Sequence, residues 1–85
     1  MSNIQIYTTR TCGYCYRAKQ LLQRKGLVFQ EIAVDGDRKA RADLLRRTSS
    51  PTVPQIWIGE HYVGGCDELH ELDRRGELDA LVQAS

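Results

Sequence analysis

The sequence predicts a single α/β domain spanning residues 1–85, in which helices flank a mixed four-stranded sheet in the order β-α-β-α-β-β-α. The chain opens with a strand–helix–strand pattern, and such a unit forms a parallel pair with a right-handed crossover. Two short apolar runs separated by a tight turn follow, which is typical of an antiparallel hairpin. The length allows one modest core, and 41% apolar with 27% charged residues is typical of a folded globular chain.

The first strand–helix–strand unit is visible in the periodicity of the N-terminal third. Apolar and polar side chains alternate over residues 4–8, which predicts a short strand. From about Tyr14, apolar residues recur at spacings of three and four, which predicts a helix ending at Gly26. Residues 27–34 are rich in β-branched and aromatic side chains and predict the second strand.

A second helix is expected after the turn at Asp35-Gly36. Asp37 is expected to cap this helix, which extends to about Arg47. The pairs Asp37–Arg41 and Asp43–Arg47 are spaced by four residues and suit its exposed face. Its inner face is expected to carry Ala40, Leu44 and Leu45.

The C-terminal part predicts a hairpin and a helix. Residues 55–58 and 62–63 are expected to form two antiparallel strands, with Trp57 in the core. Asp67 is expected to cap the third helix. A short amphipathic segment follows Gly76 and closes the chain.

The charge distribution is uneven although the formal net charge is only +1. Residues 1–25 carry five basic side chains and no acidic one, whereas the chain from Glu60 onward carries seven acids and two arginines. A positive first third would favour thiolates and anionic ligands; the alternative is two solvated faces of opposite sign. With no basic stripe interleaved with aromatics, nucleic-acid binding is not expected.

The cysteine count points away from a disulfide-stapled secreted protein. Three cysteines at uneven spacing make a poor disulfide framework. The N-terminus lacks the pattern of a signal peptide, and no apolar run approaches the roughly 20 residues of a membrane span. We therefore expect a cytoplasmic protein with no membrane partner, where a cysteine pair is catalytic or metal-binding.

The motif Cys12-Gly13-Tyr14-Cys15 lies where a strand passes into a helix. Free backbone N–H groups and the positive end of the helix dipole favour a thiolate at this position. Arg10 and Arg17 would add to the effect. Cys12 is thus predicted to attack disulfides, and Cys15, one helical turn further in and more buried, to resolve a mixed disulfide by exchange.

Two other interpretations of the cysteine pair remain open at this point. Cys12 and Cys15 could be half of a zinc site, but the other half would come from Cys66, His61 or His70, none at the usual ligand spacing. The pair could also be two inert buried cysteines, although they flank a glycine turn rather than a periodic apolar face.

Three segments in the expected order resemble the dithiol glutaredoxin family, and within it the bacterial glutaredoxin 3 group. They are Tyr7–Lys19 (YTTRTCGYCYRAK), Thr52–Ile56 (TVPQI) and Gly64–Leu69 (GGCDEL). The resemblance implies one glutaredoxin domain with a thioredoxin-like fold, glutathione as co-substrate, and a monomer. It also implies reduction of glutathione mixed disulfides and of some protein disulfides, such as that of ribonucleotide reductase.

The resemblance assigns Tyr14 and the Thr52-Val53-Pro54 segment to a glutathione groove. It implies a cis bond before Pro54, which would leave the Val53 backbone open to pair with an extended peptide. Without the resemblance, a proline that starts an edge strand would be the preferred interpretation.

The resemblance assigns the γ-glutamyl end of glutathione to Gly64-Gly65 and Asp67. Two glycines allow close approach of a ligand, and a helix N-terminus offers N–H groups to a carboxylate. Cys66 also falls in this segment, either as a small packed residue or as an accessory thiol. Arg46 or Arg47 is a candidate for the glycyl carboxylate, with solvated surface charge as the alternative.

Two positions depart from the family pattern. Gly13 replaces the common proline and predicts a more flexible turn. Thr9 stands where the family usually has a basic residue, so Arg10 becomes the candidate for a basic contact to glutathione. Because family members with a small residue at the position of Gly13 resemble cluster binders, the alternative function is a [2Fe–2S] cluster held by Cys12 of two subunits and two glutathiones. A non-catalytic interaction domain would not be expected to keep all three motifs.

Overall fold

The sheet of the computed structural model, which describes residues 2–84, has four strands. They are β1 (Ile4–Thr8), β2 (Gln30–Ala33), β3 (Gln55–Ile58) and β4 (His61–Gly64). The spatial order is β2-β1-β3-β4, with β1 and β2 parallel and the other two pairs antiparallel. The expected mixed sheet is confirmed.

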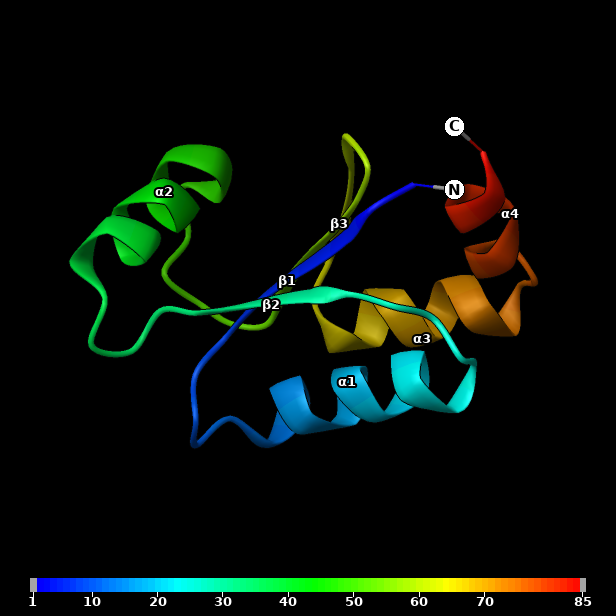
Figure 1. Ribbon diagram of the computed structural model, residues 1–85, viewed down its shortest axis with the longest axis horizontal. Coiled ribbons are helices and arrows are strands. Elements are labelled where there is room, and N and C mark those ends of the chain that lie inside the picture. Colours follow the sequence, from blue (N-terminus) through cyan, green and yellow to red (C-terminus); the bar gives the residue numbers. More distant parts are fainter. Residues whose placement is uncertain (1, 85) are drawn as a thin grey trace.

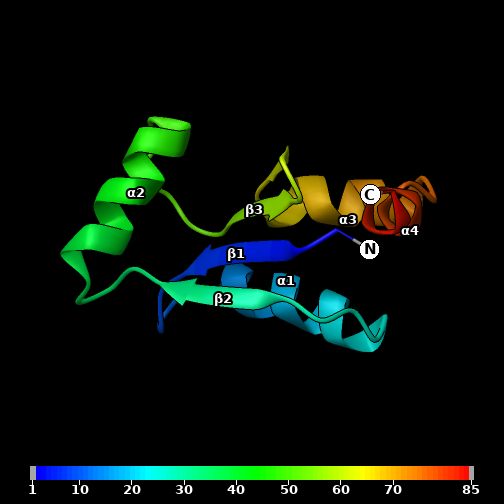
Figure 2. The same cartoon turned by 45° about the horizontal axis from the view of Figure 1, so that its top comes forward.

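Four helices cover the two faces of the sheet unequally. They are α1 (Gly13–Arg24), α2 (Arg38–Thr48), α3 (Cys66–Arg74) and α4 (Leu78–Gln83). Helices α1 and α3 lie side by side under one face, whereas α2 lies on the other face (Figures 1 and 2). Within residues 2–84, no helix has the length and apolar character required to cross a membrane.

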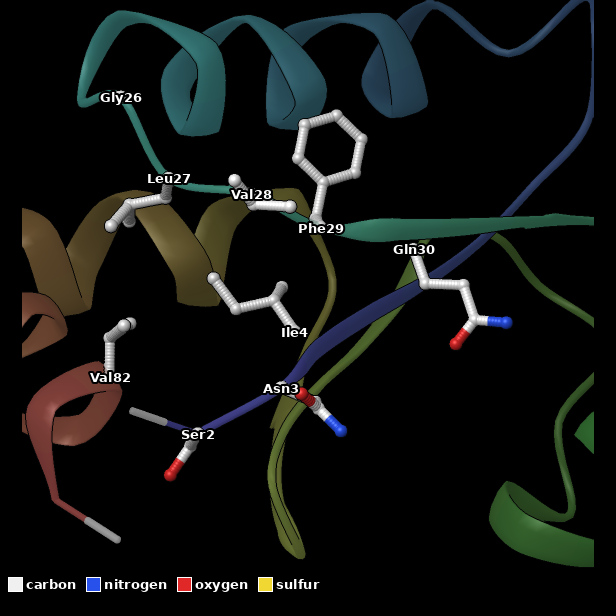
Figure 3. Close-up of a pocket in the computed structure, with 9 residues that line it drawn as sticks. All are labelled: Ser2, Asn3, Ile4, Gly26, Leu27, Val28, Phe29, Gln30 and Val82. Carbon is white, nitrogen blue, oxygen red and sulfur yellow. The ribbon is translucent and has the colours of Figure 1, made fainter.

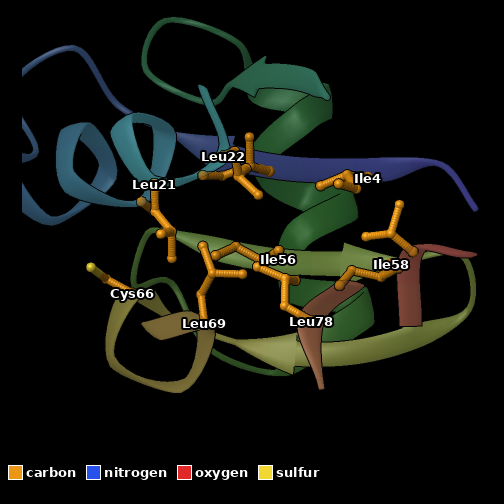
Figure 4. Packing of buried hydrophobic residues seen from close by; sticks show 11 residues of the cluster. Ile4, Leu21, Leu22, Ile56, Ile58, Cys66, Leu69 and Leu78 are labelled. Carbon is orange, nitrogen blue, oxygen red and sulfur yellow. The ribbon is translucent and has the colours of Figure 1, made fainter. Parts of the chain in front are cut away.

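The larger core cluster lies between the sheet and helices α1, α3 and α4 (Figure 4). Alternate residues of a strand point to the same face, so Ile4 and Ile6 of β1 share this cluster with Ile56 and Ile58 of β3. The helices contribute Ala18, Leu21, Leu22, Leu69, Leu78 and Val82. This packing fixes the direction of α1, and with it the place where α1 begins.

The smaller cluster lies under α2 and contains Tyr7, Val34, Ala40, Leu44 and Trp57. The prediction that Leu45 lies on the inner face of α2 is wrong, because this residue is 42% exposed. Successive helical residues point about 100° apart, so a face centred on Leu44 turns Leu45 away.

The prediction of an ion pair between Asp43 and Arg47 is also wrong, because both residues have other partners. The Arg47 guanidinium lies 3.8 Å from the centroid of the Trp57 ring and donates to the Tyr7 hydroxyl at 3.0 Å. Asp43 pairs with Arg46 instead. A cation over an aromatic face is attracted by the ring's quadrupole, which binds the end of α2 to the sheet.

Strand β2 begins three residues later than expected. At the end of α1, Gly26 takes φ +69° and Leu27 N–H donates to the Leu22 carbonyl at 3.0 Å, the geometry of a Schellman motif. The register aligns Gln30 with Gln5. Leu27 and Val28 therefore lie beyond the start of β1 and have no strand beside them to pair with.

Candidate active site

Cys12 is the N-cap residue of α1 and is partly exposed. Its Sγ accepts the Cys15 N–H at 3.1 Å, and its backbone carbonyl accepts the Tyr16 N–H at 3.1 Å. The first turn of α1 carries no acidic residue. A negatively charged sulfur at this position is stabilised by a direct N–H donor and by the helix dipole.

Cys15 is buried, with 1% of its surface exposed. Burial raises its pKa to about 12, and the hydrogen bond and charge of Cys12 act in the same direction. The backbone of Thr9 and the charge of Lys19 lower it. Cys15 is thus a neutral and buried thiol near pH 7.

A groove of about 270 Å³ adjoins Cys12. The Val53–Pro54 bond is cis, as expected, and the Val53 carbonyl lies 3.6 Å from Cys12 Sγ. The groove is lined by Tyr14, Thr52, Val53, Pro54, Gln55, Tyr62, Gly65, Cys66, Asp67 and Glu68. Most predicted glutathione contacts are therefore brought together, but Arg10, Gly64, Arg46 and Arg47 are not among the residues that line the groove.

Arg10 is directed elsewhere. Its Nε lies 3.2 Å from Asp35 Oδ2, and the same oxygen accepts the Arg10 backbone N–H at 3.2 Å. These contacts, the backbone one foremost, lower the pKa of Asp35. The sequence could not show this pairing, because the two residues are brought together only by the parallel pairing of β1 and β2.

Gly64 and Gly65 shape the second wall of the groove. Gly64 takes φ +114°, a conformation that favours glycine, and a Cβ there would lie 3.0 Å from Glu68 Oε1. A Cβ on Gly65 would lie 3.4 Å from the Pro54 carbonyl oxygen. Two residues without side chains thus allow α3 to begin close to the cis-proline loop.

The predicted cap of α3 is wrong. The N-cap residue is Gly65, and Glu68 Oε1 accepts the Gly65 N–H at 2.7 Å. Asp67 lies in the first turn of α3, where it lines the groove instead of capping the helix. The turn at Gly64 determines where α3 begins and so makes Gly65 the N-cap residue.

Three lining residues, Gln55, Tyr62 and Glu68, were not expected in the site. The Tyr62 hydroxyl donates to Gln55 Oε1, and Gln55 Nε2 donates to Thr52 Oγ1 at 3.0 Å. Gln55 is only 6% exposed, so these bonds satisfy a buried amide. A polar residue at the start of a buried strand was the one signal for it in the sequence.

Cys66 borders the groove but is almost completely buried. It is 6% exposed, burial raises its pKa, and its Sγ lies 3.4 Å from His70 Nδ1. Within the part of the chain that the structure describes, no three His, Cys, Asp or Glu side chains are placed to hold a metal ion. One chain, with its single accessible cysteine, does not fit a [2Fe–2S] cluster, which takes a set of thiolates.

A second hollow, of about 450 Å³, lies at the opposite end of α1 (Figure 3). Its walls come from the start of β1, the segment 26–30 and α4, with Ile4, Leu27 and Val82 among its apolar side chains. Among residues 2–84, its lining contains no nucleophilic thiol and no charged group. The groove beside Cys12 is therefore the candidate active site.

Comparison with known proteins shows the family to which the chain belongs. The glutaredoxin family model matches residues 4–63. The chain is 64% identical over 84 residues to a glutaredoxin of Pseudomonas aeruginosa, with 99% of this chain and 100% of the relative covered. It is 49% identical over 83 residues to glutaredoxin 3 of Escherichia coli K12, with 98% and 100% covered.

A solved structure gives the same result for the fold. The crystal structure of a buckwheat glutaredoxin–glutathione complex superposes with a TM-score of 0.85 at 33% identity, covering 95% of this chain and 76% of that one. The thioredoxin-like fold expected from the resemblance is thereby confirmed. The chain belongs to the glutaredoxin family of thiol–disulfide oxidoreductases.

Proposed function

We propose that the chain is a glutathione-dependent oxidoreductase that reduces mixed disulfides of glutathione with proteins and with small thiols. The observation that carries the proposal is Cys12 Sγ, 3.1 Å from the Cys15 N–H and 3.6 Å from the Val53 carbonyl that borders the groove. A nucleophilic sulfur and a peptide-sized groove are thus adjacent. The similar buckwheat protein was solved as a complex with glutathione.

The chemistry of the groove suits glutathione. Its γ-glutamyl end carries an ammonium and a carboxylate, which match the Asp67 carboxylate and the backbone N–H groups at the start of α3. The Val53 backbone, which precedes the cis bond, can pair with the cysteinyl part of the tripeptide. Tyr14, 58% exposed, offers an apolar ring along the groove.

The proposed reaction proceeds by two exchanges. The Cys12 thiolate attacks the glutathione sulfur of the mixed disulfide, and the protein thiolate leaves and takes a proton from water. A second glutathione, as its thiolate, then attacks the glutathione sulfur on Cys12. Oxidised glutathione is released, and the Cys12 thiolate is restored.

A dithiol route serves protein disulfides, with ribonucleotide reductase among the candidate partners. Cys12 forms the mixed disulfide with the partner, and Cys15 then attacks Cys12 Sγ to release the partner's thiolate. Their positions one helical turn apart, with Cys15 N–H already on Cys12 Sγ, suit this second attack. The product is an intramolecular disulfide, which glutathione reduces.

The proposal is tested by trapping and by a groove variant. Cys15→Ser incubated with oxidised glutathione should accumulate a Cys12–glutathione disulfide, detected by mass spectrometry. Asp67→Asn should raise the KM for glutathione about tenfold, the cost of one lost charge-assisted hydrogen bond. Glu60→Gln, in the exposed hairpin turn, is the matched control and should leave KM unchanged.

Cluster binding is the outcome that would displace this proposal. It would require a second copy and external thiols, because one chain supplies one accessible cysteine. Anaerobic incubation with iron, sulfide and glutathione should leave the protein colourless and monomeric. A visible chromophore that is lost in Cys12→Ser, together with no disulfide reduction, would favour the cluster.

A further inference from the structure

A polar network not used by Cys12 lies at the junction of β1, β2 and α1. Lys19 Nζ on α1 lies 2.9 Å from Glu31 Oε2 on β2. The same carboxylate oxygen accepts the Thr8 hydroxyl of β1 at 2.7 Å. Thr8 is 1% exposed, and the Lys19 side chain is 26% exposed. The hydrogen bonds of Thr8 and Lys19 lower the pKa of Glu31, so the carboxylate is charged near neutral pH.

This network is adjacent to Cys15. Lys19 follows Cys15 by four residues on α1, and side chains at this spacing lie on the same helix face, about 5–6 Å apart at Cβ. The backbone of Thr9, the residue after Thr8, lowers the pKa of Cys15. The ammonium group and the buried thiol therefore share one partly desolvated corner.

The charges around Cys15 can be enumerated by element. On α1, Lys19 is the basic group whose charge favours the Cys15 thiolate, and the N-cap residue Cys12 carries no charge once its sulfur is bonded to the partner. From β2, Glu31 opposes Lys19 by pairing with it. From α3, which packs against α1, Cys66 is a neutral thiol because burial raises its pKa. The electrostatic stabilisation of a thiolate at Cys15 therefore depends on the Lys19–Glu31 pair.

The resolving step needs a thiolate that the burial of Cys15 disfavours. Cys15 must lose its proton to solvent before its sulfur can attack Cys12 Sγ. The new Cys12–Cys15 bond forms as the bond from Cys12 Sγ to the partner's sulfur breaks, and the electron pair leaves on the partner's thiolate. A cation fixed beside Cys15 stabilises the charge that develops during this loss.

We propose that Lys19 is a positioning residue for the dithiol route, its ammonium group favouring the Cys15 thiolate, and that Glu31 moderates it. The inference rests on the dithiol route proposed above. It predicts opposite effects for the two partners. Removing the charge of Lys19 slows the resolving step, whereas removing the charge of Glu31 leaves Lys19 unopposed and accelerates it.

The expected size of the change in the rate of the resolving step follows from thiol chemistry. Loss of a nearby opposite charge raises a pKa by about one unit or more, which lowers the thiolate fraction about tenfold. A more basic thiolate is more nucleophilic, with a Brønsted coefficient of about 0.4–0.5. The net change in rate is therefore about threefold.

Ellman's reagent isolates the step without glutathione. Cys12 releases one equivalent of coloured thiolate as it forms the aryl disulfide, and Cys15 releases the second as it closes the intramolecular disulfide. Cys15→Ser defines the first phase alone. We expect Lys19→Gln to slow the second phase about threefold and Glu31→Gln to accelerate it to a similar extent.

The controls separate charge from structure. Lys19→Arg keeps the charge and should keep the rate, and Lys25→Gln removes a comparable ion-paired lysine at the far end of α1 and should change nothing. Slowing by both Lys19→Gln and Glu31→Gln, or by neither, would overturn the proposal. Because the Ellman's reagent assay contains no glutathione, its result is independent of the glutathione assay. If the protein does not reduce glutathione mixed disulfides but the Lys19 and Glu31 variants change the second phase in opposite directions, only the proposed function is overturned.

Discussion

Cys12 and Cys15 differ in environment although one helical turn separates them. Cys12 Sγ receives the N–H of Cys15 at the open end of α1, whereas Cys15 is 1% exposed. The first is placed to attack a disulfide from solution, and the second can reach only the sulfur beside it. The sequence predicted this division, because it follows from the spacing and from the strand-to-helix junction.

Alkylation tests the division directly. Iodoacetamide near neutral pH should modify Cys12 and leave Cys15 unmodified, because burial keeps Cys15 protonated, with a pKa of about 12, and out of reach. Cys66, buried with a raised pKa, should also stay unmodified. Peptide mapping by mass spectrometry gives the site, and equal labelling of Cys15 would contradict this difference between the two cysteines.

Two side-chain contacts could not be predicted from the sequence. The pairing of Arg10 with Asp35 and the stacking of Arg47 on Trp57 join residues far apart in the chain. Local periodicity and motif spacing contain no information on such contacts. They depend on strand register and on the angle at which α2 packs.

The element that completes the groove is the junction of β4 and α3. Its geometry depends on Gly64 at φ +114° and on the bond from Gly65 N–H to Glu68 Oε1. The sequence predicted a hairpin followed by a helix here, but placed the cap at Asp67. The helix type follows from periodicity, whereas the cap depends on a backbone conformation that only the folded turn shows.

Gly64→Ala should destabilise this junction. Its left-handed φ and a Cβ placed 3.0–3.3 Å from Glu68 atoms should cost about 1–3 kcal/mol of the free energy of unfolding. Urea denaturation measures the loss. Gly36→Ala, also at positive φ but with no atom within 4 Å of its Cβ, is the control for the contact. An equal loss in both variants would show that backbone conformation alone matters.

The whole molecule is a sheet with unequal coverage of its two faces. Three helices bury the face that carries Ile6 and Ile56, and α2 alone buries the face that carries Tyr7 and Trp57. The parallel pair, the antiparallel hairpin and the flanking helices were predictable from the strand–helix–strand pattern and the tight turn. The boundaries of β2 and the exposure of Leu45 were not, because they depend on register and helix rotation.

Leu44 is the fully buried leucine that α2 contributes to the smaller cluster. Leu44→Ala should lower the free energy of unfolding by about 2–5 kcal/mol, through lost transfer energy and a residual cavity. Leu45→Ala, at an exposed neighbouring position, is the control and should cost far less. Comparable losses by thermal or urea denaturation would contradict the observed orientation of α2.

The stability of the molecule should also depend on Glu31. Its pKa is lowered by the Thr8 hydroxyl and then by Lys19, so its contribution is fully present above the unfolded value of about 4.3. That contribution is lost as the pH falls through the lower, folded value. Glu31→Gln should therefore be less sensitive to acid below about pH 4 than the unmodified chain, as measured by Tm against pH. Parallel curves would contradict the network.

Cys12 is proposed above as the nucleophile of a glutathione-dependent oxidoreductase. The most direct test is the reduction of a glutathionylated peptide by glutathione, comparing the unmodified chain with Cys12→Ser and Cys15→Ser. Activity abolished in Cys12→Ser and retained in Cys15→Ser is the predicted result. Activity that survives in Cys12→Ser, or is absent from the unmodified chain, would contradict it.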